Sequence, residues 1–210
     1  MGNRGKQNSF SRRKPRIEPR YTVYIICEGE KTEYIYFKAI KKARRLSNIR
    51  IDIDPGTRSG SDPVNLIEYA KNKKIQEEYD DTVRKRRNTQ CVFDDDGRQY
   101  INQVLLDASK RPKVEVAFSN PCFELWYYLH YDYSTGAFTQ SQMIERLKAL
   151  IPDYTKDRNV FDMLPDRATA MERAEELRQH HASVGSKLTD NPSTSVDKLV
   201  ELLYSLDDSR

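Results

Sequence analysis

Hydrophobic residues along this chain switch repeatedly between the spacing of strands and the spacing of helices, up to about residue 133. Runs rich in β-branched and aromatic residues predict buried strands, and isoleucines alternating with polar residues predict a half-exposed one. The predicted strands are 21–27, 49–53, 90–93 and 114–118, and the predicted helices are 33–46, 63–79 and 100–109. Because strands alternate with helices, we expect an α/β fold with a largely parallel sheet flanked by helices.

The pattern changes in the second part of the chain. Residues 121–131 are apolar nearly all round, which predicts a buried helix. Beyond Tyr133 the spacing predicts helices with no strand between them. These helices are 141–150, 165–181 and 195–206. We therefore expect one domain over residues 21–210, mainly helical from about residue 134.

Charge is distributed unevenly along the 210 residues, although the net charge is only +4. Residues 1–20 carry many basic side chains against the single acid Glu18 and few large apolar ones, which predicts a disordered basic arm. Residues 41–45 and 84–87 form two further basic blocks, each of which alone is more often a solvated face. Together the blocks favour a nucleic-acid partner. The expected contacts in the arm are Arg12, Arg13, Lys14 and Arg16.

Several classes of protein are disfavoured by what the sequence lacks. No apolar run is long enough for a transmembrane helix, and the basic N-terminus has no apolar region typical of a secretory signal. The three cysteines are widely spaced in apolar surroundings, which favours buried free thiols over a zinc site. We therefore expect a cytoplasmic protein without a membrane partner. The sequence contains neither a Walker A motif nor a G-x-G-x-x-G motif, so no nucleotide-binding loop is predicted.

Acidic residues follow two of the predicted strands. Glu28 lies just after the first, in a Glu-Gly-Glu-Lys turn before a helix for which Thr32 is a candidate N-cap. Asp94 and Asp96 follow the strand 90–93, and alternate residues can direct two carboxylates to one side, with Asp95 pointing away. In open α/β sheets, ligands bind at such strand ends. Oxygen ligands favour Mg²⁺ or Mn²⁺, so we expect Glu28, Asp94 and Asp96 to bind one of these cations.

A third segment, Ser119 to Trp126, adds two candidate supporting residues. Asn120 stands at a strand end before a proline, where an ordinary N-cap also explains it. Glu124 lies one turn into an apolar helix, and a buried carboxylate needs a partner or a metal ion. We expect Glu124 near the acidic cluster, either as an outer ligand or oriented by Asn120.

The order of four segments resembles the RloB-like family. They are C-E-G-E-K-T-E after the first strand, V-F-D-D-D, S-N-P-C-F-E-L-W-Y-Y-L-H and N-P-S-T-S-V-D-K-L, and the resemblance extends from about Tyr21 to about Leu203. It implies a Toprim-like fold, also found in topoisomerases, primases and OLD-family nucleases. In that fold a Glu after the first strand and a D-x-D after a later one hold Mg²⁺, roles that map onto Glu28, Asp94 and Asp96. It also implies a phage-defence locus, commonly beside an ATPase gene.

These observations together predict a Mg²⁺-dependent nuclease that hydrolyses DNA or RNA, with tRNA among the targets suited to a defence effector. Glu28 or a water on the metal is the candidate base, and Lys31 would steady charge in the transition state. A second interpretation is a non-catalytic nucleic-acid-binding or regulatory subunit of a defence complex, in which the same acids form a structural network. A third is a Toprim enzyme that transfers phosphoryl groups on nucleotides. Metal-dependent turnover separates the first two.

Overall fold

The computed structural model describes residues 22–46, 49–53, 62–78, 87–95, 100–187 and 189–206. The predicted arm at residues 1–20 lies outside these residues, together with its candidate nucleic-acid contacts Arg12, Arg13, Lys14 and Arg16. Asp96, one of the three predicted metal ligands, also lies outside them.

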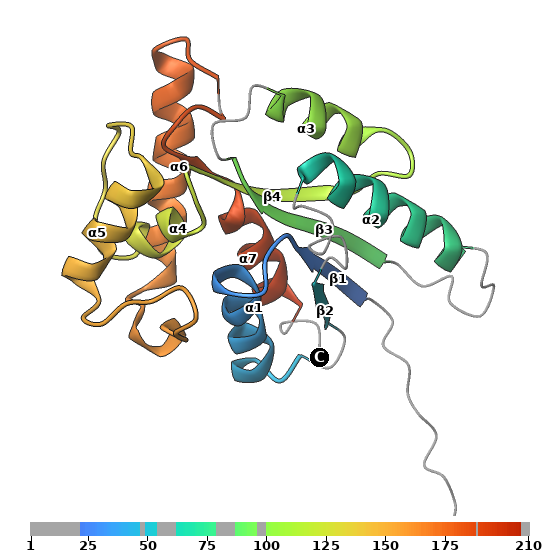
Figure 1. The fold of residues 1–210 in the computed structure, drawn as a ribbon, viewed down its shortest axis with the longest axis horizontal. Helices are drawn as coiled ribbons and strands as arrows, with labels where there is room; N and C mark the ends of the chain where they lie inside the picture. The colour runs from blue at the N-terminus through green and yellow to red at the C-terminus, as the bar shows by residue number, and fades with distance from the viewer. Residues whose placement is uncertain are drawn as a thin grey trace, which may run out of the picture.

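One sheet organises the described residues, with the strand order β2-β1-β3-β4-β5 (Figure 1). The strands are β1 Thr22–Cys27, β2 Ile49–Ile53, β3 Arg87–Asp94, β4 Glu115–Asn120 and β5 Ser193–Thr194. The first four pair in parallel, and β5 pairs with β4 in the antiparallel sense. The predicted α/β fold with a largely parallel sheet is confirmed. The expectation of no strand after Tyr133 is wrong, because β5 forms by pairing with β4 rather than from an apolar run of its own.

Helices cover both faces of the sheet. They are α1 Thr32–Ala43, α2 Pro63–Glu78, α3 Ile101–Ser109, α4 Glu124–Leu129, α5 Gln140–Leu150, α6 Arg167–Ser183 and α7 Val196–Ser205, with a 3₁₀ turn η3 at Phe161–Met163. In Figure 1, α2 and α3 lie over one face and α1 over the other. Strand β1 shows why both faces need cover, because Ile26 packs into the core under α2 and α3 while Ile25 packs into the core with α1 and α7.

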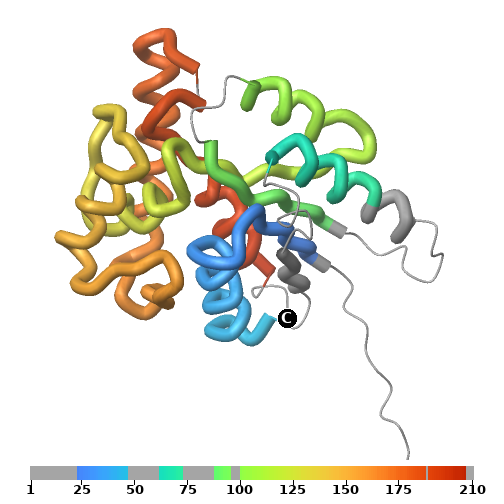
Figure 2. Tube along the Cα trace, in the orientation of Figure 1, coloured from blue at the N-terminus to red at the C-terminus, as the bar shows by residue number. Residues whose placement is uncertain are grey.

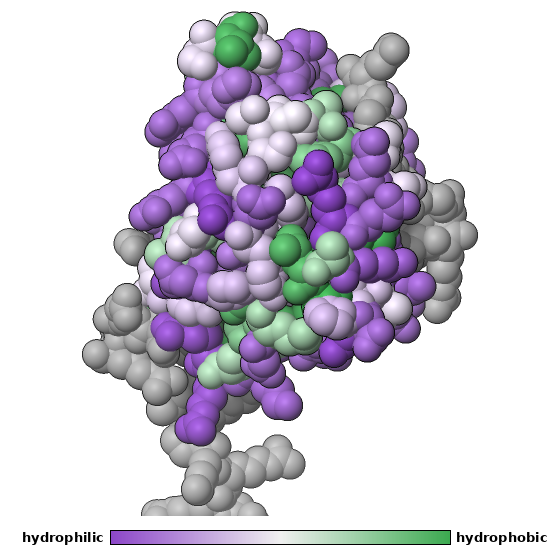
Figure 3. Space-filling view, turned by 90° about the vertical axis from the view of Figure 1, so that its left-hand side faces the viewer, coloured by the Kyte–Doolittle hydropathy of each residue, from purple (hydrophilic) through white to green (hydrophobic). Residues whose placement is uncertain are grey.

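The helical part between β4 and β5 extends beyond the edge of the sheet. Figure 2 shows the chain leaving β4, forming α4 to α6 to one side, and returning through β5 to α7. Aromatic rings join this part to α1, since Tyr36 makes edge contacts with Phe123, Trp126 and Tyr127 at centroid distances of 5.6, 6.5 and 5.6 Å. Its outer face carries mostly hydrophilic side chains around a small hydrophobic area (Figure 3).

Some predicted element boundaries differ from the observed ones. Strand β3 begins at Arg87 rather than at residue 90, because its polar first residues pair with the whole length of β1. The buried helix predicted at residues 121–131 is only α4, Glu124–Leu129, so Glu124 is its first residue rather than one turn inside. The described cysteines, Cys27, Cys91 and Cys122, are free and buried, as predicted.

Candidate functional site

Glu28 and Asp94 meet at the carboxyl ends of two neighbouring strands. The backbone N–H of Glu28 donates to the Val92 carbonyl at 2.9 Å, which continues the β1–β3 pairing one residue past β1. Glu28 is buried, and its Oε2 accepts a hydrogen bond from the backbone N–H of Asp94 at 3.3 Å. The fold therefore brings together two of the three predicted ligands, which are 66 residues apart in the chain.

The position of this pair follows from the strand order. From β1 the chain crosses to β2 on one side, and from β2 it crosses back over β1 to β3 on the other side. Right-handed crossovers in opposite directions place α1 and α2 on opposite faces, which opens a crevice at the carboxyl ends of β1 and β3. Glu28 and Asp94 stand at this point, where doubly wound sheets bind ligands.

Asp95 and Asn120 form the wall of the site towards β4. The backbone N–H of Asp95 donates to the Ser119 carbonyl at 2.8 Å, and its buried carboxylate accepts from Asn120 Nδ2 at 3.2 Å. The same Nδ2 donates to the Thr189 carbonyl at 3.0 Å. Asn120 therefore orients Asp95, and the expectation that it orients Glu124 is wrong. The reason is that β3 and β4 pair side by side, which places Asn120 next to Asp95.

Glu124 connects three segments that are distant in sequence. Its side chain is only 1% exposed, and its Oε1 accepts from Thr32 Oγ1 at 3.2 Å and from the Tyr154 hydroxyl at 2.9 Å. Lys156 Nζ lies 3.8 Å from the same oxygen. Glu124 Oε2 is buried without a hydrogen bond to any described residue. At Oε1, the predicted partners of this carboxylate come from α1 and from the loop after α5.

Thr32 does not act as the helix cap that the sequence predicts. The N-cap of α1 is Lys31, and no side chain accepts a hydrogen bond there. Thr32 is instead the first residue of the helix, and its hydroxyl donates to Glu124 and to the Lys156 carbonyl, at 3.2 and 3.3 Å. A hydroxyl that donates to a buried carboxylate stabilises the fold more than the same hydroxyl would as a cap on an exposed helix end.

Glu33 belongs to the site and was missed as a site residue. Burial raises its pKa from 4.5 to about 7, its own backbone N–H opposes the rise, and the negative charges of Glu124 and Glu28 add to it. A Cβ on Gly29 would lie 3.4 Å from Glu33 Oε1, so the turn backbone passes close to this carboxylate. The sequence held a signal, because Glu33 lies on the buried stripe of α1 with Tyr36, Phe37 and Ile40.

Electrostatic contacts tie Glu124 to the Glu28–Asp94 pair. Burial chiefly raises the pKa of the Cys122 thiol, and the charges of Glu124 and Asp94 raise it further. Because both carboxylates act on one thiol, and both Glu28 and Glu124 act on Glu33, the acids form one cluster. The role of Glu124 as an outer ligand stays a prediction.

Two lysines flank the acids. Lys31 is exposed at the start of α1, and Lys156, which sequence reasoning missed, is 38% exposed beside Glu124. No ion pair between Lys31 and a cluster acid is found among the described residues. Its role towards a phosphate stays a prediction.

The described carboxylates suit a hard divalent cation in chemistry but do not complete its cage. Within residues 22–46, 49–53, 62–78, 87–95, 100–187 and 189–206, no group of three or more His, Cys, Asp or Glu side chains is arranged to hold a metal ion. Glu28 and Asp94 supply two oxygen donors, and the third predicted ligand, Asp96, lies outside those residues. Oxygen donors of this kind match Mg²⁺ or Mn²⁺.

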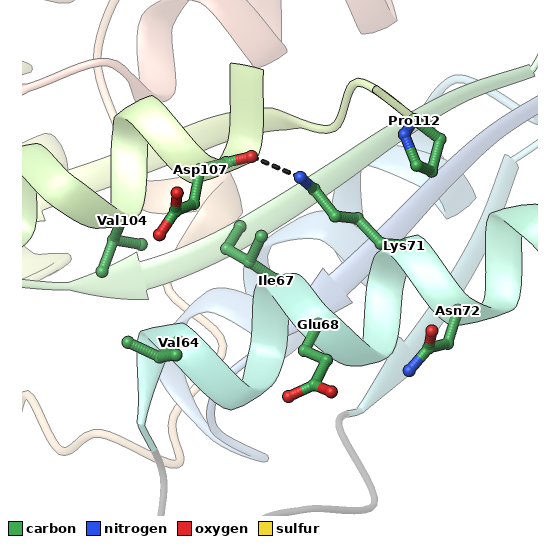
Figure 4. A pocket seen from close by; sticks show the side chains of 8 residues that line it. All are labelled: Val64, Ile67, Glu68, Lys71, Asn72, Val104, Asp107 and Pro112. Atoms are coloured by element: carbon green, nitrogen blue, oxygen red, sulfur yellow. Dashed lines mark hydrogen bonds between the residues drawn. The ribbon is translucent and has the colours of Figure 1, made fainter. Parts of the chain in front are cut away.

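A cavity of about 290 Å³ lies between α2 and α3, away from the acids. Figure 4 shows Val64, Ile67 and Val104 around it, with Lys71 donating to the Asp107 carbonyl across one side. None of the clustered carboxylates lines it.

None of the helices in the described part of the chain has both the length and the apolar character that crossing a bilayer requires.

Comparison with known proteins identifies a family. A family model described as RloB-like protein matches residues 23–203, which is most of the chain. No curated protein and no solved structure gives a significant match. The matched range includes Glu28, Asp94, Asp96, Asn120 and Glu124.

Proposed function

This chain belongs to the RloB-like family, and from that premise we propose that it is a Mg²⁺- or Mn²⁺-dependent nuclease with a Toprim-like fold. The observation that carries the proposal is the contact between Glu28 Oε2 and the Asp94 backbone N–H at 3.3 Å. It joins a glutamate after the first strand to the last residue of β3. The strand order, with β1 next to β3, supports a Toprim-like arrangement.

Glu28, Asp94 and Asp96 would hold the cation. When bound, it would polarise the scissile phosphate and stabilise the leaving oxygen. The Glu28 backbone N–H donates to Val92, and the Glu28 carboxylate accepts from the Asp94 backbone N–H. These two bonds keep the carboxylate over the end of β3, so it is positioned before any substrate arrives. Glu28 is the candidate base that accepts a proton from the attacking water.

The remaining polar groups position the catalytic ones. Asn120 holds the Asp95 carboxylate and so fixes the chain next to Asp94. Thr32 and Tyr154 hold Glu124 beside Glu33, whose pKa of about 7 allows it to keep a proton near neutral pH. A proton on Glu33 lowers the repulsion among the carboxylates.

The proposed substrate is DNA or RNA, with tRNA among the candidates. The proposed setting is phage defence with an ATPase encoded nearby. Family membership alone supports this setting.

The test is incubation of the full chain with mixed RNA and DNA substrates in Mg²⁺, Mn²⁺ or EDTA. Cleavage should require the metal, and Glu28→Gln, Asp94→Asn and Asp96→Asn should each lower kcat by about 100-fold or more. Glu68→Gln is the matched control, because Glu68 is exposed on α2 across the sheet.

Full activity in both Glu28→Gln and Asp96→Asn would refute the site. Nucleic-acid binding without metal-dependent turnover would instead assign the chain to the non-catalytic class.

A further inference from the structure

The exposed side of α1 carries a line of positive charges that begins at the acidic site. Lys31 is the N-cap, Lys38 and Lys42 lie in the helix, and Arg45 follows its last turn. Lys38 and Lys42 are four residues apart, which places them on one side of a helix with 3.6 residues per turn. Lys31 and Arg45 lie just outside the two ends of the helix and extend this line of charge. All four side chains are exposed. We call these four residues the α1 basic face.

These charges form no ion pair with an acid within the described part of the chain. The ion pairs found there involve none of the four residues. The only acidic residue within α1 is Glu33, which is buried on the opposite side of the helix. Lys38 lies 4.8 Å from the centre of the Tyr34 ring, so an aromatic side chain accompanies the line.

The acidic site needs such a surface if it is to receive a polyanion. The carboxylates of Glu28 and Asp94 repel a phosphodiester backbone, so binding energy must come from cations nearby. Lys31 follows Glu28 by three residues, which places one end of the basic face at the site. At about 1.5 Å per residue the 12 residues of α1 extend for about 18 Å, a length that matches about five phosphates of one duplex strand.

We propose that the α1 basic face binds the phosphodiester backbone of a nucleic acid and leads it to the carboxylates at the ends of β1 and β3. The proposal rests on the proposed function, because it takes the substrate to be a nucleic acid. A nucleic-acid backbone is the expected occupant because its negative charge complements the α1 basic face and because that face is continuous with the acidic site. Contacts of this kind go to phosphates, so they position the strand without reading its sequence.

The test compares the triple variant Lys38→Gln, Lys42→Gln, Arg45→Gln with the wild-type chain. The matched control, Arg111→Gln, Lys148→Gln, Lys187→Gln, also removes two lysines and one arginine, all exposed, from other parts of the surface. Both variants keep every proposed catalytic residue. Binding of labelled single-stranded RNA, single-stranded DNA and duplex DNA is measured in EDTA across a salt series, and thermal melting confirms that each variant folds.

The triple variant should raise Kd by about tenfold or more at low salt and flatten the slope of log K against log salt by about 2 to 3. The control variant should change neither quantity by a comparable amount. With metal present, KM should rise while kcat at saturating substrate is kept, since the carboxylates are intact.

An unchanged Kd and salt slope in the triple variant would overturn the proposal while leaving cleavage by the wild-type chain intact. Equal weakening in both variants would also overturn it, because the effect would follow net charge alone. A loss of binding to anionic lipid vesicles, with oligonucleotide binding unchanged, would assign the face to a membrane surface and overturn it too. If the wild type binds but does not cleave, and only the triple variant binds more weakly, the basic face is supported and the nuclease is rejected.

Discussion

Replacing Glu33 by glutamine tests the electrostatics of the acidic cluster directly. Burial and the charges of Glu124 and Glu28 raise the pKa of Glu33 from 4.5 to about 7. The difference is about 2.5 pKa units, and each unit corresponds to about 1.36 kcal/mol. Ionising Glu33 therefore destabilises the folded state by about 3 kcal/mol. The glutamine side chain has nearly the same shape but no charge to lose or gain.

The sign follows from proton linkage. Between pH 4.5 and about 7 the folded protein holds a proton on Glu33 that the unfolded chain releases. The stability that Glu33 contributes is therefore fully present below pH 4.5 and is lost as pH rises through about 7. The Glu33→Gln variant should match the wild type near pH 4.5 and be more stable by about 2 to 3 kcal/mol at pH 8.

Urea unfolding of the two proteins, in EDTA at several values from pH 5 to pH 8, measures this difference. The slope m should be the same in both, so the midpoint reports stability. Glu68→Gln, exposed on α2, is the control and should show no growing difference with pH. A Glu33→Gln difference that is constant across this pH range would refute the raised pKa and the close packing of the carboxylates.

Two further predictions concern buried contacts. Tyr154→Phe removes a hydroxyl that donates to buried Glu124 at 2.9 Å, and urea unfolding should show a loss of about 1.5 to 3 kcal/mol. A loss below about 0.5 kcal/mol, as expected for a surface substitution, would contradict the role given to Tyr154. Arg178→Met removes the 2.7 Å partner of Asp197, which is 4% exposed, and leaves only the exposed Lys198 at 3.7 Å to offset the buried charge, so the loss should be about 3 kcal/mol. Adding Asp197→Leu should restore part of that stability, and a double variant no better than Arg178→Met would count against the buried pair.

Local patterns in the sequence were sufficient for most of the elements. The apolar runs before Glu28 and Asp94 predict strands because a strand buried on both faces must be apolar along its length. The helix that follows Glu28 is predicted from an apolar face that includes Tyr36 and Ile40, and both are buried in the structure. The two-residue strand β5 has no such pattern and could not be predicted.

The candidate site was predictable in part. Glu28 and Asp94 could be named because each follows a strand, and strand ends are recognisable locally. Lys156 and Tyr154 could not, because they lie in a loop whose sequence has no regular pattern and reach Glu124 only through the fold. Asn120 was named, but its partner was not, since that partner depends on the pairing of β3 with β4.

The sequence by itself determined the alternation of strands and helices, the acids that follow β1 and β3, and the membership of a family, because these depend on residues close together in the chain. Only the tertiary structure decided that β3 lies beside β1, that Glu33 and Glu124 are buried in one cluster, and that Thr32 bonds to Glu124 instead of capping its helix. These outcomes depend on which distant segments pair and on how much water they exclude. A single buried carboxylate outweighs the local preference of a helix end, because an unpaired buried charge costs several kcal/mol and a cap contributes only about one.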